Sequence, residues 1–345
     1  MAKIIKTLGI VLVSLIAAAA IGAVWLYNSG FTLGKPTYIY IDRNDNIDSV
    51  EYKIKETCHP QSMRAFQAWA ILLKLEDRIR TGKYEVTADM MMKDLVRNIR
   101  NHNEQPIRIV VPSVRTMPEM AKRLSQQLMI DSAEIANYID ETSHLKNWGY
   151  TQENIPAFFI PNTYEVYWDM SVEALFERLH KENTAFWNEK RLAKLKEAGE
   201  YAGRGLTKEE VATLASIIDS ETANNAEKAT IAALYMNRLR MGMPLQSDPT
   251  VKFALQDWGL RRILHKHLEV ESPYNTYKNT GLPPGPICVP SIAGIEAVLN
   301  HDKNNYIYMC AKEDFSGTHN FATNYAEHQK NAARYVKALN QRGIR

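Results

Sequence analysis

An uncharged apolar segment, Leu8 to Tyr27, places the strongest constraint on the fold of this chain. Its length of about 20 residues is enough to cross the hydrocarbon core of a bilayer as a helix, the form in which a single segment satisfies its own backbone there. Lys3 and Lys6 precede the segment, and Trp25 and Tyr27 form an aromatic anchor at its far end. The positive-inside tendency then predicts a cytoplasmic tail at residues 1–7, a transmembrane helix at 8–27 and an exported remainder.

A cleaved signal peptide is the alternative for the same segment. Its apolar core would be shorter and would be followed by a small-residue cleavage site, whereas Val24 to Asn28 is bulky. We therefore expect a retained single-pass anchor.

Composition sets wider limits on the exported part. With 345 residues, of which 45% are hydrophobic and 23% charged, the chain can build more than one core. A net charge of +3 is too small to indicate a nucleic-acid partner. The cysteines Cys58, Cys288 and Cys310 follow no metal-ligand spacing. One disulfide is possible, with Cys288 and Cys310 as the pair to test, and free buried thiols fit equally well.

The segment from residue 28 to 104 predicts a small α+β domain. Tyr38 to Ile41 has the character of a strand, a helix begins near Ile47, and Gly82 to Val86 is a second strand before a helix at Met90 to Ile99. We assign the remainder, residues 105–345, to a second, mixed α+β domain, where Ile107 to Val111 predicts a strand and Thr116 starts a helix.

A carboxylate ends a well-marked helix in that second domain. Thr207 and Glu210 form a capping box, which sets the helix start and its phase. Apolar residues then follow helical spacing up to Ile218, and Glu221 falls at the border of the buried stripe. Burial raises the pKa of a carboxyl group, as a general acid requires. A solvent-exposed or arginine-paired glutamate is the alternative from helix phase alone.

The segments after Glu221 have the composition of a polar cleft. A second helix at residues 227–241 carries Arg238 on its apolar face, where a buried arginine needs an anion. Three irregular segments, 245–250, 272–277 and 280–286, present amides, hydroxyls and phenols. These neutral groups suit a carbohydrate, and no glycine-rich phosphate loop accompanies them. His319 could line the same cleft.

This ordered set of segments resembles the YceG-like endolytic murein transglycosylases, the MltG family. The segments that carry the resemblance are Ala215–Thr222, Asn237–Leu239, Leu245–Val251, Tyr274–Tyr277, Gly281–Gly285, His319–Phe321 and Glu327–His328. The core motifs span residues 206–330. The chain departs from the family pattern at Asp219, usually Glu, at Pro290-Ser291, usually Pro-Gly, and within Pro156–Tyr164.

The resemblance implies a site and a fold. The fold would be α+β, with the transmembrane helix, a LysM-like domain at residues 28–104 that binds glycan or acts as a spacer, and a YceG-like catalytic domain. Glu221 would be catalytic, and no metal or cofactor is expected. Substrate-binding residues would be Gln246, Asp248, Tyr274, Asn275, Tyr277, His319 and Asn320, with Asp219, Asn237 and Arg238 in support.

The resemblance also implies a lyase anchored in a bacterial inner membrane. Glu221 would protonate the oxygen leaving C1 of N-acetylmuramic acid and then take the proton of its C6 hydroxyl, which closes a 1,6-anhydro ring. Glycan strands are the expected partner, with peptidoglycan synthases as a further one, and strand length would be set by cleavage within nascent strands.

Three other functions stay open. Asp248 could be the second carboxylate of a hydrolytic muramidase. The chain could instead be a non-catalytic peptidoglycan-binding scaffold. A metal-dependent hydrolase using His319, Glu327 and His328 has the least support, because their spacing lacks an HExxH-like pair.

Overall fold

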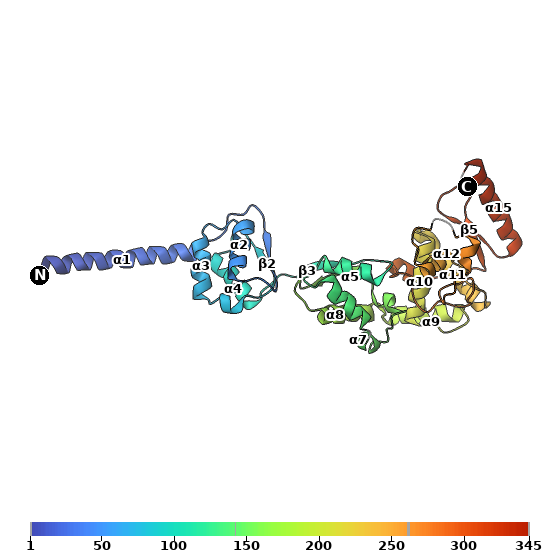
Figure 1. Ribbon diagram of the computed structural model, residues 1–345, viewed down its shortest axis with the longest axis horizontal. Helices are drawn as coiled ribbons and strands as arrows, with labels where there is room; N and C mark the ends of the chain where they lie inside the picture. The colour runs from blue at the N-terminus through green and yellow to red at the C-terminus, as the bar shows by residue number, and fades with distance from the viewer. Residues whose placement is uncertain (1, 142, 261–262, 344–345) are drawn as a thin grey trace. The chain divides into compact units, whose positions relative to one another are not determined.

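A computed structural model describes residues 2–141, 143–260 and 263–343. The described chain is a mixed α+β protein, mostly helical, with two-stranded sheets and one long apolar helix at its N-terminus (Figure 1). This confirms the predicted α+β class.

The chain divides into two compact units. Unit 1 contains residues 1–109, 127–130 and 165–171, and unit 2 contains residues 110–126, 131–164 and 172–345. Two short later segments therefore belong to unit 1, which a division of the chain at residue 104 does not anticipate.

Unit 1 begins with α1 (Ala2–Asn28), whose segment from Lys6 to Asn28 is long and apolar enough to cross a membrane. The unit then has the order β1 (Thr37–Ile41), α2 (Ile47–Cys58), α3 (Met63–Leu72), a 3₁₀ turn η1 (Glu76–Arg78), β2 (Gly82–Val86) and α4 (Met92–Asn101). Strands β1 and β2 are antiparallel, with Thr37 opposite Val86 and Ile41 opposite Gly82. The predicted strand–helix–strand–helix pattern is confirmed, and α3 is an additional helix.

The core of unit 1 lies between this hairpin and the helices. Ile39, Ile41, Tyr84 and Val86 project from the two strands into a cluster that includes Leu95 and Ile99 of α4. Alternate burial along β2 explains why this strand was recognisable in the sequence.

Strands β3 (Ile107–Val111) and β4 (Asn162–Val166) form a second two-stranded sheet, at the point where the chain passes between the units. Unit 2 then contains α5 (Met117–Ser125), α6 (Ser132–Asp140), α7 (Ser143–Lys146), η2 (Ile155–Phe158), α8 (Val172–Phe186) and α9 (Glu189–Tyr201). Thr116 is the N-cap of α5, as predicted.

The C-terminal half of unit 2 carries the candidate site. Its elements are α10 (Lys208–Glu221), α11 (Asn225–Arg240), α12 (Asp248–Leu255), α13 (His265–Leu268), α14 (Ile292–Leu299), β5 (Tyr308–Ala311), β6 (His319–Ala322) and α15 (Tyr325–Gln341). Helix α10 packs against α14 and α11, and β5 pairs antiparallel with β6. Helix α11 begins two residues before the predicted start, because Asn224 caps it.

Candidate active site

Glu221 is the last residue of a buried helix. The capping box of Thr207 and Glu210 is present, as the sequence predicts, and every residue from Val211 to Ile218 is buried. Thr222 is extended, so α10 ends directly after Glu221. The side chain of Glu221 is half-buried and lines a cavity.

Two hydroxyl groups hold one oxygen of this carboxyl group. Tyr235 Oη, from α11, donates to Glu221 Oε1 at 2.8 Å. Ser247 Oγ, just before α12, donates to the same oxygen. Both donor residues are 1% exposed, so their hydroxyls are held in place by the core. Glu221 Oε2 therefore takes no bond from these two donors and stays available to a ligand.

Burial raises the pKa of Glu221 above its ordinary value, because the charged form loses solvation. The bonds from Ser247 and Tyr235 oppose this effect, and the negative charge of Asp248 adds to it. The net direction is upward, which favours a carboxyl group that holds its proton. The same buried setting raises the pKa of Tyr235 well above its ordinary value, so this phenol stays a donor.

The cavity around Glu221 has a volume of about 290 Å³. Its wall is built from α10, α11, the segment before α12, the 274–277 segment, β5 and the start of β6. The lining residues are Glu221, Leu234, Tyr235, Arg238, Leu245, Gln246, Asp248, Tyr277, Met309, Cys310, Ala311 and His319.

Two polar pairs fix side chains in this wall. Tyr277 Oη donates to Asp248 Oδ1 at 2.6 Å, and burial together with this carboxylate raises the pKa of Tyr277. His319 donates its backbone N–H to Glu227 Oε1 at 2.8 Å, and its Nδ1 lies 3.3 Å from Glu227 Oε2. Each pair joins segments that are distant in sequence, so both hold the cavity in shape.

Arg238 is buried in the cavity wall, and no carboxylate of the described residues forms the ion pair that we expected. Its guanidinium donates to the backbone oxygens of Ile307 at 2.6 Å, Pro244 at 2.9 Å and Leu245 at 3.0 Å. A fourth bond, of 3.0 Å, goes to Gln246 Oε1. The expectation of an anionic partner was wrong, because backbone carbonyl oxygens can accept hydrogen bonds from the N–H groups of a planar guanidinium just as well.

A second pocket is lined in part by the same helices, α10 and α12. Its volume is about 500 Å³, and its lining includes Asp219, Ser220, Pro249 and Lys252 together with Arg115 and Trp258. Ser220 and Glu221 are adjacent in sequence, as are Asp248 and Pro249, and each pair contributes one residue to each pocket. The end of α10 and the start of α12 therefore contribute to the lining of both pockets.

Asp219 belongs to the second pocket and not to the cavity of Glu221. Its carboxylate forms an ion pair of 2.8 Å with Lys228 Nζ and accepts a bond of 2.6 Å from the Ser291 N–H. A Cβ atom at Gly294 would come within 2.6 Å of Asp219 Oδ1, so this glycine permits the close approach.

The comparisons with known proteins agree with this architecture. The model of the YceG-like family matches residues 39–334. The chain belongs to the YceG-like family. An endolytic murein transglycosylase of Bacillus subtilis is 43% identical over 130 residues, which cover 38% of this chain and 35% of that protein. One of Streptococcus pneumoniae is 25% identical over 294 residues, or 75% of this chain and 51% of that protein. The chain thus spans about half or less of these relatives' length.

A solved structure shares the fold of this YceG-like chain. The crystal structure of a YceG-like protein of Listeria monocytogenes aligns with a TM-score of 0.55 and 25% identity, and the match covers 86% of this chain and 99% of that one.

The structure brings part of the predicted site together. Gln246, Asp248, Tyr277, His319 and Arg238 line the cavity with Glu221. Of the five other predicted residues, Asp219 lines the second pocket, and Asn237, Tyr274, Asn275 and Asn320 line neither of the two.

Each of these four has partners of its own. Asn237 donates to the backbone oxygens of Asn304 and Tyr306, and Asn275 donates to those of Leu268 and Val270. Tyr274 packs against Phe253, with ring centroids 4.6 Å apart. Asn320 donates to Glu313 Oε2 at 2.7 Å, on the opposite face of β6 from His319. The geometry gives these side chains a part in loop and strand structure.

Three residues of the site were not singled out from the sequence. Ser247 lies inside the motif 245–251, and Tyr235 and Glu227 lie on the helix predicted at residues 227–241. A hydroxyl on an otherwise apolar stripe was the available signal for Tyr235, because a buried phenol needs a partner.

The remaining sequence hypotheses concern thiols and metal ligands. Cys58, Cys288 and Cys310 are free thiols, so Cys288 and Cys310 form no disulfide, and they line different pockets. His319 contacts Glu227, whereas His328 stacks on Tyr308. Among the described residues, one group of potential metal ligands converges, and it contains neither of these histidines.

Proposed function

We propose that this protein is an endolytic lytic transglycosylase of peptidoglycan. The observation that carries the proposal is the carboxyl group of Glu221, which has a raised pKa and is held by two buried hydroxyls in a polar cavity. The named relatives support the substrate class, because they are endolytic murein transglycosylases.

The reaction needs one group that acts first as an acid and then as a base. Protonated Glu221 gives its proton to the glycosidic oxygen while the bond from that oxygen to C1 of N-acetylmuramic acid breaks. The resulting carboxylate takes the proton of the C6 hydroxyl while O6 bonds to C1. The products are a new 4-hydroxyl end and a 1,6-anhydro end, no water is consumed, and Glu221 regains its proton.

Tyr235 and Ser247 position the reacting group. Both donate to Oε1, so the proton to be transferred belongs on Oε2. Their bonds also stabilise the carboxylate that exists between the two proton transfers. Gln246, Tyr277 and His319 would contact hydroxyl and N-acetyl groups of the glycan.

A hydrolytic muramidase is the second candidate, because Asp248 lines the same cavity as Glu221. In this reaction a second carboxylate activates water or attacks C1. The bond that Asp248 accepts from Tyr277 favours a role in the wall instead. The two reactions differ in product, since hydrolysis leaves a reducing end.

We further propose that the second pocket receives the peptide stem of the substrate. Arg115 and Lys252 bring positive charge to this pocket, and the Arg115 guanidinium lies 5.6 Å from the centre of the Trp258 ring. Asp219 in the same pocket is neutralised by Lys228. Glu119 also lines the pocket and pairs with Arg123 at 3.6 Å. A stem carries carboxylates and starts from the muramic acid, so Arg115 and Lys252 are the groups of this pocket that would bind it.

The end of α1 supports a retained membrane anchor. Trp69 Nε1 donates to the backbone oxygen of Leu26 at 3.1 Å, and Lys93 Nζ lies 3.2 Å from the centre of the Tyr27 ring. Ser29 and Phe31 are both 3% exposed. Cleavage near residue 28 would remove these contacts from unit 1. An intact-mass measurement of the protein purified from membranes tests this, because cleavage would remove the mass of the first 28 residues.

The test of the activity uses the full chain in detergent with purified peptidoglycan and identifies the products by mass spectrometry. We expect muropeptides with 1,6-anhydro-N-acetylmuramic acid ends from the wild type and from Glu200→Gln, an exposed control, and none from Glu221→Gln. Reducing ends would instead establish the muramidase. If the folded wild type releases no product, the result would favour the hypothesis of a non-catalytic binding scaffold.

A further inference from the structure

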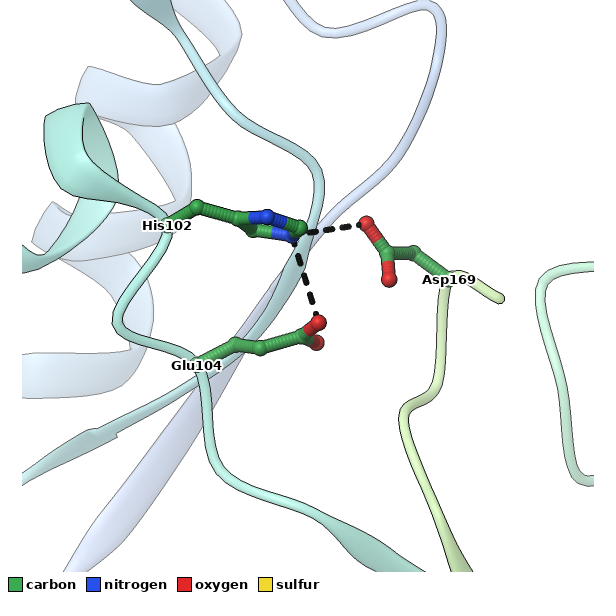
Figure 2. Close-up of side chains that lie close together, drawn as sticks. All are labelled: His102, Glu104 and Asp169. Atoms are coloured by element: carbon green, nitrogen blue, oxygen red, sulfur yellow. Dashed lines mark hydrogen bonds and ion pairs between the residues drawn. The ribbon is translucent and has the colours of Figure 1, made fainter. Parts of the chain in front are cut away.

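Three side chains that the proposed reaction does not use converge in unit 1. His102 follows the end of α4, Glu104 lies two residues later, and Asp169 comes from the segment 165–171 that returns to this unit (Figure 2). One possible ligand atom from each residue lies within 4.8 Å of the other two.

His102 contacts both carboxylates of this cluster. Its Nε2 lies 3.2 Å from Glu104 Oε1 and 3.1 Å from Asp169 Oδ2, as the dashed lines in Figure 2 show. One ring nitrogen carries at most one proton, so it cannot donate a linear hydrogen bond to two carboxylates at once. Spacings of about 3.3 Å are those between neighbouring ligands of a tetrahedral ion with bonds of about 2.0 Å.

The two carboxylates of the cluster share one histidine. The carboxylates of Glu104 and Asp169 are 4% and 9% exposed, and His102 is the cation that pairs with them among the residues described in this structure. Lys83 is nearby, but its ammonium lies over the Tyr38 ring, 3.9 Å from the centroid. Two buried carboxylates beside each other repel, and a divalent cation between them would offset this repulsion.

Neighbouring groups orient both carboxylates. Thr81 Oγ1 donates to Asp169 Oδ2, and the Lys83 N–H donates to Glu104 Oε2 at 3.4 Å. Gly82 lies between these donors with φ +131°, and a Cβ there would come within 2.7 Å of Glu104 Oε2. A side chain at residue 82 would therefore occupy the place of the Glu104 carboxylate. Such outer contacts fix metal ligands in known sites.

We propose that His102, Glu104 and Asp169 bind a divalent transition-metal ion of the zinc type. One imidazole and two carboxylates suit Zn²⁺, whereas Ca²⁺ and Mg²⁺ prefer oxygen ligands alone. His102 is 46% exposed, so an ion reaches the cluster from solvent and a water molecule completes its coordination. The bound ion fastens the segment 165–171 to the end of α4, within unit 1.

The chain offers a matched control for this site. His59 and His102 both follow a helix of unit 1 in the left-handed conformation, with φ of 45° and 59°, and both are exposed. His59→Ala therefore removes an imidazole from the same kind of position without touching the cluster.

The test titrates the chelator-stripped full chain, in detergent, with ZnCl₂ in a calorimeter. We expect one Zn²⁺ per chain, an affinity at least 100-fold lower in His102→Ala, and no change in His59→Ala. Asp169→Asn, which keeps the side-chain shape, should weaken binding in the same way, and circular dichroism checks that each variant is folded. The wild type loaded with Co²⁺ should show visible absorption of a four-coordinate ion.

Several results would overturn the proposal. If stripped wild type takes up no stoichiometric Zn²⁺, the cluster is an ion pair only. If His102→Ala and Asp169→Asn bind Zn²⁺ as tightly as the wild type, or His59→Ala loses it equally, the ion is bound elsewhere. If Ca²⁺ or Mg²⁺ displaces Zn²⁺ at equal concentration, the proposed class of metal is wrong.

Discussion

Tyr235 Oη lies 2.8 Å from Glu221 Oε1 and joins the last turn of α10 to the middle of α11. This phenol keeps its proton, because burial raises its pKa, so it donates to Glu221 in both protonation states. The bond favours the charged form of Glu221, whereas burial disfavours it, and burial has the larger effect.

Removal of this bond should shift the pH dependence of the activity. The acid form of Glu221 is lost as pH rises through its raised pKa, so the rate falls on the alkaline side. Tyr235→Phe removes a bond that lowers this pKa, and the alkaline limb of the kcat profile should move to higher pH. Tyr38→Phe, which breaks the bond between Tyr38 and Glu85 in unit 1, is the control. An unchanged limb in Tyr235→Phe would argue against Glu221 as the titrating acid.

Glu221→Gln should separate activity from stability. We expect a rate at least about 10³-fold lower, in the range of general acid–base catalysis, and a free energy of unfolding within about 1 kcal/mol of the wild type. The folded-state pKa of Glu221 lies above its unfolded value. Its contribution to stability is therefore complete below the unfolded pKa and is lost as pH rises through the folded one. Urea unfolding at several pH values should thus show that, at alkaline pH, the free energy of unfolding of Glu221→Gln rises relative to that of the wild type.

Arg238→Lys should destabilise the fold although it keeps the charge. An ammonium cannot reach all three backbone oxygens that the guanidinium binds, and we expect a cost of about 2–4 kcal/mol in urea unfolding. Arg240→Lys, on an exposed position of the same helix, should cost less than about 1 kcal/mol. Equal effects of the two substitutions would contradict the bracing role of Arg238.

Asp219→Asn should leave a buried ammonium without its partner. The side chains of Asp219 and Lys228 are 11% and 8% exposed, and breaking such a pair costs about 3–5 kcal/mol. The double variant Asp219→Asn with Lys228→Met should recover part of this loss, because neither charge remains. If the double variant loses as much thermal stability as the two single variants together, the two charges do not interact.

Arg115→Ala tests the second pocket with two substrates. We expect KM for stem-bearing peptidoglycan to rise about tenfold, as for the loss of one charged contact of about 1.4 kcal/mol, and KM for glycan without stems to stay unchanged. Arg64→Ala, exposed in unit 1, is the control. An equal rise for both substrates would mean that the pocket binds glycan and not the stem.

Local signals explain what could be predicted from the sequence. The capping box at Thr207 is complete within four residues, so it fixed the phase of α10 and the place of Glu221. Strands β1 to β3 were recognisable for the same reason, since residue type and alternation act over a few positions.

Long-range partners explain what could not be predicted. Burial of Arg238 was visible in the helix pattern, but one of its acceptors, the Ile307 oxygen, is 69 residues away. His102 and Asp169 are likewise 67 residues apart. Helix phase gives the direction of a side chain and not the group that it meets, so Asn237, Tyr274, Asn275 and Asn320 were placed in the site by their motifs alone.

The junction between α1 and the rest of unit 1 has a mechanical consequence. Helix α1 ends at Asn28, and Phe31 is already part of the core of unit 1, so the two are joined without a flexible tether. With α1 in a bilayer, unit 1 cannot drift away from the lipid surface by more than its own size. As the proposed anchor, α1 would therefore hold the folded core of unit 1 next to the lipid.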